Sequence, residues 1–341
     1  LYTWGKLEAG IGLARTGLAA AALQSEKATW ELAVKIRGTW EALAYVSEAE
    51  RVVALQRSIG NRLVDLSEKS AAAGFMTPSD LASARIKLKE IDLAQARLAD
   101  QRNRMLADLA YMSGIEIASI DRLSLAAGPA GRLAWSEPEA WEQARAGSYD
   151  LALAAAMVEA RRGMRDLAER EARGLPDIGL HLELSYGGAR FPFLETDWYG
   201  QDDWQLTFSL GTSGNLFGSG VKRGEAAKAK AKASEAEAQS ADASRAVRAF
   251  IRETFLGMDL QRARLEYAAL KQDGWAADLA QKRAAMDAGA GSEPEYLSLM
   301  MEALGGVAEA YGTLAEYRGA LLSVEAAAGA SAGTTADISV P

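Results

Sequence analysis

The side chains that most often carry chemistry are scarce in this chain, and this narrows the kinds of site it can hold. Of the 341 residues none is cysteine and only one, His181, is histidine. Composition therefore excludes a thiolate metal site, a cysteine nucleophile, a disulfide framework and a multi-histidine metal centre. The sequence also lacks a G-x-x-x-x-G-K-[ST] phosphate-binding motif, and no carboxylate pair stands out as a general acid and base. We expect no catalytic residue, no metal and no cofactor, and hence no enzyme.

Charge and hydropathy remove two further classes of protein. The 46 Asp and Glu residues outnumber the 38 Lys and Arg residues, giving a net charge of -8, whereas nucleic-acid binders present a basic surface. We therefore expect no nucleic-acid partner. In the stretch 226–238, AAKAKAKASEAEA, charged residues alternate with small ones, which is typical of a solvated helix face. The longest apolar runs, such as 151–158, fall far short of the roughly 20 residues of a membrane-spanning helix.

An offset of 215 residues aligns the two ends of the chain without a gap, which predicts an internal duplication. Glycines at breaks in the helical pattern recur at this offset, for example Gly74 with Gly289 and Gly114 with Gly329. The segment that precedes the second copy has no counterpart before the first, so we expect the chain to begin partway through its first repeat. The expected divisions are an incomplete first repeat at 1–122, a connector at 123–136, a second repeat at 137–329 and a disordered tail at 330–341.

Each copy predicts a long helix, a glycine-containing break and a shorter helix. From about Lys6 to Ala73 no proline interrupts a helical pattern, and a helix of that length reaches about 100 Å. The segment 74–80 then provides a helix stop, an N-cap, a first-turn proline and an acidic first turn. The second copy repeats this plan over about 219–288 and 294–328. One further helix is expected over about 138–173.

Two segments, 176–187 and 204–213, follow the period of two that predicts β-strands. Each is about as long as a tilted strand that crosses a bilayer, and its large apolar residues share one face. The polar residues that share the other face include His181, Glu183, Gln205 and Thr207. Aromatic residues lie between the two strands, as in a membrane-interface girdle, at Phe191, Phe193, Trp198 and Tyr199. A hairpin packed on a soluble helical core shows the same alternation, so both alternatives remain open.

The chain resembles the TolC-like outer-membrane efflux family over nearly its whole length, from Leu1 to Gly329. The matching segments are a helix stop and strand in GLPDIGLHLELSYG, a return strand and helix start in WQLTFSLGTSGNLFGSGVKRGEAAKAKA, two helical tips in SAAAGFMTPSDLASAR and MDAGAGSEPEYLSL, and a terminal helix in AEYRGALLSVEAAAG. The resemblance implies a mainly α fold with a small β portion. Very long coiled-coil-like helices then form an α-helical barrel, and the strands contribute to a shared trimeric transmembrane β-barrel.

The resemblance also implies a function and partners. The chain is expected to be the channel of a tripartite efflux or type I secretion system. It would be a passive conduit in the outer membrane of a Gram-negative bacterium, with its helical part in the periplasm. The implied partners are two further copies of the chain in a homotrimer, outer-membrane lipid, a periplasmic adaptor (membrane fusion) protein, and an inner-membrane pump or ABC exporter. The four polar strand residues would line the lumen. Residues at the two tips would dock the adaptor or gate the entrance, and these are Gly74, Phe75, Thr77, Asp80, Gly289, Ser292 and Glu295.

Departures from the family pattern and competing interpretations accompany this hypothesis. The family's first helix and most of its first strand pair are expected to be missing. Its second tip often carries two acidic residues and a basic neighbour, whereas only Glu295 matches here and the other positions are Ser298 and Gly291. Turn and capping chemistry alone also accounts for the tip residues. The alternative from another class is a soluble coiled-coil scaffold or tethering protein with a small β-hairpin, and a helical enzyme is a third.

Overall fold

The computed structural model describes residues 2–116, 130–187, 203–213, 219–330 and 334–338. The chain divides into two compact units. Unit 1 comprises Leu1–Ser25 and Asp150–Ser244, and unit 2 comprises Glu26–Tyr149 and Arg245–Pro341. Two long helices contribute residues to both units.

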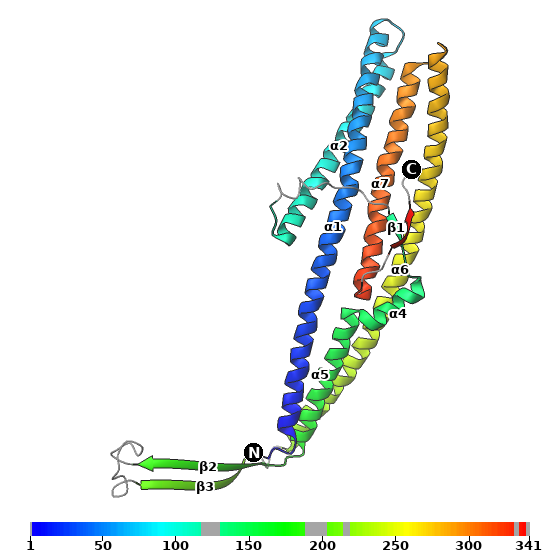
Figure 1. Cartoon of the computed structure of the whole chain (residues 1–341). Helices are drawn as coiled ribbons and strands as arrows, with labels where there is room; N and C mark the ends of the chain where they lie inside the picture. The colour runs from blue at the N-terminus through cyan, green and yellow to red at the C-terminus, as the bar shows by residue number, and fades with distance from the viewer. Residues whose placement is uncertain (1, 117–129, 188–202, 214–218, 331–333, 339–341) are drawn as a thin grey trace. The chain divides into compact units, whose positions relative to one another are not determined.

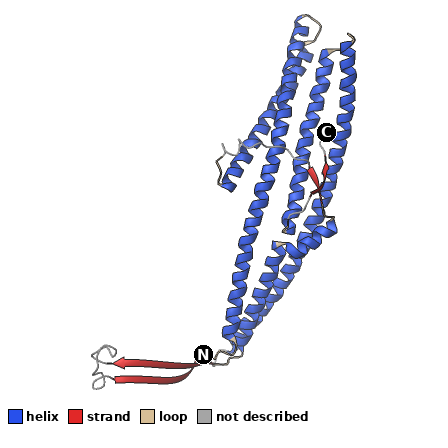
Figure 2. Cartoon of the chain, viewed as in Figure 1, coloured by secondary structure: helices blue, strands red, loops and turns tan. Residues whose placement is uncertain are grey.

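Helices make up most of the described chain (Figures 1 and 2). They are α1 (Lys6–Ala72), α2 (Pro78–Ser113), α4 (Glu137–Gly147), α5 (Tyr149–Ala172), α6 (Ser219–Asp287) and α7 (Glu293–Ala328). The bounds follow the 215-residue offset: adding 215 to 78 and 113 gives 293 and 328, the bounds of α7. Adding 215 to 72, the last residue of α1, gives 287, the last residue of α6. The predicted fold class, mainly α with a small β portion, is confirmed.

Two small antiparallel sheets complete the fold. Strands β2 (Asp177–Gly187) and β3 (Asp203–Ser213) form a hairpin in unit 1. Strands β1 (Ala130–Leu133) and β4 (Thr334–Ile338) pair in unit 2. Among the described residues no helix is both long enough and apolar enough to cross a membrane.

Two expectations from the sequence are wrong. The single helix expected over 138–173 is two helices, because Ser148 has an extended backbone (φ -64°, ψ 121°) that ends α4 before α5 begins. The tail expected to be disordered contains β4, which pairs with β1 in the expected connector. Threonine and isoleucine favour strands, but the partner strand lies about 200 residues earlier, so no local pattern reveals the pairing.

Among the described residues, the core of unit 2 contains three clusters of apolar side chains rather than one thick interior. The largest joins α6, α7 and α4 around Ile251, Leu314 and Leu321. A second joins α1 and α2 through Leu43, Leu106 and Leu109. The third joins α1, α2 and α7 and contains Val53, Ile59, Ile91 and Met301. Apolar burial is therefore distributed along the helices.

In unit 1 the start of the chain holds the base of the hairpin. The backbone of Tyr2 exchanges hydrogen bonds with that of Ile178 at 2.7 and 2.9 Å. The Trp4 Nε1–H donates to the carbonyl of Pro176 at 2.8 Å. Lys6 Nζ pairs with Asp177 Oδ1 at 2.8 Å. These contacts fix β2 to the first turn of α1.

Candidate functional site

The hairpin β2–β3 displays a row of large apolar side chains on one face. Its members face one another in the register Leu180 with Leu210, Leu182 with Phe208, and Leu184 with Leu206. Each of the six is between 56% and 71% exposed. We call these six residues the apolar ladder. Monomeric soluble proteins rarely expose a contiguous apolar patch of this kind, and such a patch marks a protein or membrane contact.

The opposite face of the hairpin carries the polar residues predicted from the sequence. Glu183 pairs in register with Thr207, His181 with Ser209, and Gln205 with Ser185. His181 Nε2 lies 3.6 Å from Glu183 Oε2, and both side chains are exposed. The structure therefore brings His181, Glu183, Gln205 and Thr207 together on one face. Their role in lining a lumen stays a prediction.

The aromatic residues predicted to form an interface girdle, Phe191, Phe193, Trp198 and Tyr199, lie outside the described residues. The structure instead shows an aromatic pair at the other end of the hairpin, which the sequence reasoning missed. The rings of Tyr2 and Trp4 lie edge to face with centroids 4.9 Å apart, and both are exposed. Two aromatic residues at alternate positions just before the first long helix were the available signal.

The first tip, residues 73–80, joins α1 to α2. Gly74 has a left-handed backbone (φ +79°), and the N–H of Phe75 donates to the carbonyl of Ser70 at 2.9 Å. The side chain of Thr77 caps α2, because its Oγ1 accepts from the Asp80 N–H at 3.2 Å and donates to Asp80 Oδ2 at 2.7 Å. Phe75 is 89% exposed. This tip thus exposes the ring of Phe75 beside the N-cap that Thr77 provides for α2.

The second tip, residues 288–295, joins α6 to α7. Gly289 has a left-handed backbone (φ +72°), and Ser292 occupies the N-cap without a side-chain cap hydrogen bond. Glu295 Oε2 accepts a hydrogen bond from Lys282 Nζ at 2.8 Å, and this contact holds the pKa of Glu295 below its ordinary value. The acidic residue predicted to lie at the entrance is therefore paired with Lys282 of α6.

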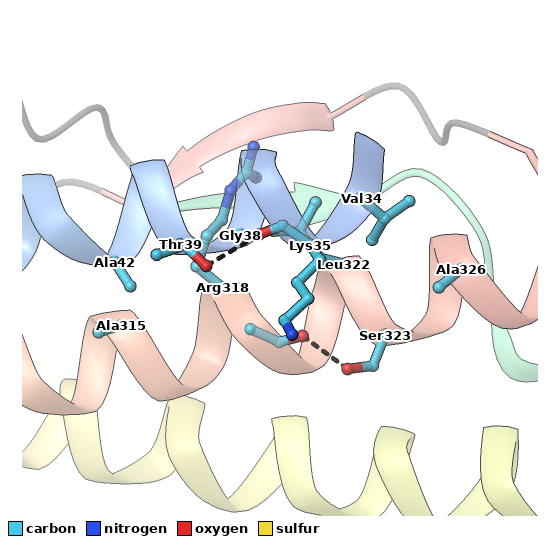
Figure 3. Close-up of a pocket in the computed structure, with 11 residues that line it drawn as sticks. Val34, Lys35, Gly38, Thr39, Ala42, Ala315, Arg318, Leu322, Ser323 and Ala326 are labelled. Carbon is cyan, nitrogen blue, oxygen red and sulfur yellow. Dashed lines mark hydrogen bonds between the residues drawn. The ribbon is translucent and has the colours of Figure 1, made fainter. Parts of the chain in front are cut away.

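A shallow groove of about 300 Å³ lies between α1 and α7 in unit 2 (Figure 3). Small residues of both helices line it, among them Gly38, Ala42, Ala315 and Ser323. Arg318 projects into the groove from α7 (Figure 3). Because these side chains are small, they leave an open groove between the two helices rather than an enclosed cavity.

Arg318 also belongs to a charge cluster that the sequence did not reveal. Arg318 Nε lies 2.5 Å from Glu41 Oε2, Arg37 Nε lies 2.9 Å from Glu41 Oε1, and Arg37 Nη1 lies 3.0 Å from Glu325 Oε2. Burial raises the pKa of Glu41, but the hydrogen bonds and charges of Arg318 and Arg37 outweigh it and hold the pKa below its ordinary value. Glu325 is only 1% exposed. The cluster ties α1 to α7 through charges that must stay paired.

Within the described part of the chain, no group of three or more histidine and acidic side chains is placed to hold a metal ion. The features that remain as candidate sites are the two faces of the hairpin in unit 1 and the two tips in unit 2. They are surfaces suited to contact rather than to chemistry.

No family model matches the sequence, and no curated protein does. Several solved structures have a similar fold. The outer membrane protein VceC from Vibrio cholerae is 18% identical with a TM-score of 0.75, over 96% of this chain and 76% of that chain. A membrane protein from Pseudomonas aeruginosa is 16% identical with a TM-score of 0.77, over 97% and 73%. The CmeC outer membrane channel of Campylobacter jejuni is 15% identical with a TM-score of 0.73, over 98% and 70%. The chain therefore has the TolC-like outer-membrane channel fold that the sequence resemblance implies.

Proposed function

We propose that this chain is one protomer of an outer-membrane efflux channel of a Gram-negative bacterium, with its helices in the periplasm. It acts as a passive conduit for a tripartite efflux or type I secretion system. The observation that carries the proposal is the exposed apolar ladder of β2–β3 on a chain with the fold of outer-membrane channels.

Lipid contact accounts for the ladder. Moving a Leu or Phe side chain from water into an apolar environment is favourable by roughly 1.5–3 kcal/mol, and six such side chains are available. A hairpin alone has two open edges, whose unpaired backbone groups hydrocarbon does not tolerate. The edges must therefore pair with further strands, and strands of two further copies in a homotrimer would close a shared barrel. The soluble scaffold hypothesis instead requires the ladder to pack on helices, and its residues are more than half exposed.

The two faces and the two tips then take distinct roles. The face with His181, Glu183, Gln205 and Thr207 lines the lumen, opposite the lipid-facing ladder. The tips, with Gly74, Phe75, Thr77, Asp80, Gly289, Ser292 and Glu295, contact a periplasmic adaptor protein or gate the entrance. Since the proposal assigns no chemical step to this chain, an inner-membrane pump or ABC exporter must provide the energy.

Neighbouring residues of β3 provide a test with an internal control. Phe208→Asp places a carboxylate on the ladder, and Thr207→Asp places the same carboxylate on the polar face of the adjacent position. A charge that faces lipid at mid-depth destabilises a membrane barrel by up to roughly 2–4 kcal/mol, less for Asp than for Arg. We expect Phe208→Asp to abolish the trimer in the outer-membrane fraction and Thr207→Asp to preserve it.

The assay expresses the full-length protein in Gram-negative cells that lack their own efflux channel. The readouts are membrane fractionation, trimer migration on gels and retention of a fluorescent efflux substrate. The proposal fails if the unmodified protein fractionates with soluble proteins. It also fails if the two aspartate variants assemble and export equally well.

A further inference from the structure

The lysines of this chain are concentrated where α6 begins. Four of its twelve lysines lie within eleven residues, at Lys222, Lys228, Lys230 and Lys232. We call these four residues the lysine cluster. With Arg223 the segment 222–232 carries five cations against one anion, Glu225, in a chain whose net charge is -8. The net charge of this segment is therefore positive, whereas that of the whole chain is negative.

The lysine cluster is not neutralised by its neighbours. In the part of the chain that the structure describes, none of its four members forms a hydrogen bond or an ion pair. Other lysines do form ion pairs, namely Lys6, Lys27, Lys69, Lys89 and Lys282. The acidic residues that follow the cluster have other contacts, since Glu237 pairs with Arg162 and Glu235 accepts from Gln239. Lys228, Lys230 and Lys232 are exposed to solvent.

Contacts within unit 1 place the cluster beside the base of the hairpin. Helix α5 leads into β2, and α6 follows β3 (Figure 1). Arg162 on α5 pairs with Glu237 on α6 at 2.8 Å. From that contact the two antiparallel helices run toward the hairpin, α5 to its last residue Ala172 and α6 back to its first residue Ser219. The cluster therefore lies on the first turns of α6, between that contact and the hairpin, and spans about 15 Å at 1.5 Å per residue.

The same end of unit 1 carries the exposed aromatic pair Tyr2 and Trp4. Tryptophan and tyrosine concentrate at the boundary between bilayer and water. The apolar ladder begins at Leu180, two residues beyond the bridge between Tyr2 and Ile178. Followed from α6 through the base of the hairpin into its strands, unit 1 carries cations, then aromatic rings, then an apolar face. Headgroups, interface and hydrocarbon follow one another in the same order in a bilayer.

We infer that the lysine cluster binds the anionic phospholipid headgroups of the leaflet at the base of the hairpin. The inference rests on the proposed outer-membrane function. Anionic lipid attracts cations within about one Debye length of the surface, roughly 8 Å at physiological ionic strength. Lys222 lies in the first turn of α6, on the side of the hairpin, and the other three lysines follow about 9, 12 and 15 Å further along the helix. Side chains of a helix lean toward its N-terminus, so these long side chains extend back toward the hairpin base and the headgroups. The contact sets how deeply the hairpin inserts.

Vesicle binding tests the inference. The full-length protein, kept in detergent and then diluted, is mixed with phosphatidylcholine vesicles with or without phosphatidylglycerol, and bound protein is separated by flotation. We expect the unmodified protein to bind the anionic vesicles at least about tenfold more tightly at low salt, with the preference lost at high salt. The variant with Lys222→Gln, Lys228→Gln, Lys230→Gln and Lys232→Gln should bind both kinds of vesicle alike.

A charge-matched control removes four exposed cations from unit 2. It carries Lys87→Gln, Arg97→Gln, Arg252→Gln and Arg283→Gln, and it should keep the preference for anionic vesicles. The inference is overturned if the unmodified protein shows no preference, if the lysine variant keeps it, or if the control loses it. If the unmodified protein binds no vesicle at all, the proposed outer-membrane function fails as well. The salt dependence of the unmodified protein needs no variant and tests the inference independently of folding.

Discussion

The two helical tips share a backbone and differ in their side chains. Gly74 and Gly289, related by the 215-residue offset, both have a left-handed backbone, at φ +79° and +72°. In both tips the next residue donates its N–H to the carbonyl five residues earlier at 2.9 Å. One turn geometry therefore ends both long helices.

The side chains stabilise that turn in two different ways. The first tip has a local cap from Thr77, and the second has an ion pair between Glu295 and Lys282 across the two helices. Lys282 corresponds to Ser67 under the offset, and Ser67 is buried and donates to the carbonyl of Leu63. The exposed Phe75 corresponds to Ala290. The glycine therefore fixes the turn, while the other residues of the tips differ and form two different surfaces.

The largest effect on the free energy of unfolding is expected from the left-handed glycine that the two tips share. Gly74→Val and Gly289→Val each place a β-branched residue in the left-handed region, which costs roughly 1–2 kcal/mol or more. A Cβ at either position meets no atom within 4 Å, so the cost is backbone strain alone and should be equal at the two tips. Denaturant unfolding of the solubilised protein measures it. The helical Gly220, also in open space, is the control, and Gly220→Ala should not destabilise.

The next largest effect on stability differs between the two tips and concerns their N-cap residues. Thr77→Ala removes a side-chain cap and should lower the free energy of unfolding by about 1 kcal/mol. Ser292→Ala removes a hydroxyl that forms no cap hydrogen bond and should change it by less than about 0.5 kcal/mol. Thr77→Ser keeps the hydroxyl and should retain most of the stability. Equal losses from the two alanine variants would show that the caps do not differ.

A smaller effect depends on pH and concerns the second tip. The hydrogen bond and charge of Lys282 lower the pKa of Glu295, so the pair stabilises the fold above the ordinary carboxyl pKa. The stabilisation is lost as pH falls through the lowered value. In Lys282→Gln the pKa of Glu295 should rise toward its ordinary value, which a carboxyl titration by NMR detects. Added salt should weaken the effect because the pair is exposed. An unchanged pKa in Lys282→Gln would contradict the pairing.

Most of the helices and the strands β2 and β3 could be predicted from the sequence because their signals are local. The alternation of Leu180, Leu182 and Leu184 identifies a strand within nine residues, and Gly74 followed by Thr77 marks a helix break within four. The fold class follows from such patterns and from the family resemblance, and it is confirmed. The roles of the tip and lumen residues stay predictions.

What the sequence could not predict depends on contacts between distant residues. Arg318 and Glu41 are 277 positions apart, and each looks like an ordinary surface charge in its own helix. The pairing of β4 with β1 likewise joins segments about 200 positions apart. Tyr2 and Trp4 have a local signal in their alternate positions, but their place at the base of the hairpin depends on the bridge between Tyr2 and Ile178. In each case the fold brings distant residues together, and no local sequence pattern predicts that contact.

The smallest effect on stability is expected at Phe75, whose counterpart in the second tip is Ala290. Phe75 is 89% exposed, so Phe75→Ala should change the free energy of unfolding by less than about 0.5 kcal/mol. If the tips contact an adaptor, the same variant should lower export and cross-linking to the adaptor while the amount of outer-membrane trimer stays constant. Tyr111→Ala removes an equally exposed aromatic ring, 90% exposed near the other end of α2, and should leave export unchanged. Equal export by the two variants would show that Phe75 does not contribute to adaptor docking. The two tips would then differ only in how they are stabilised.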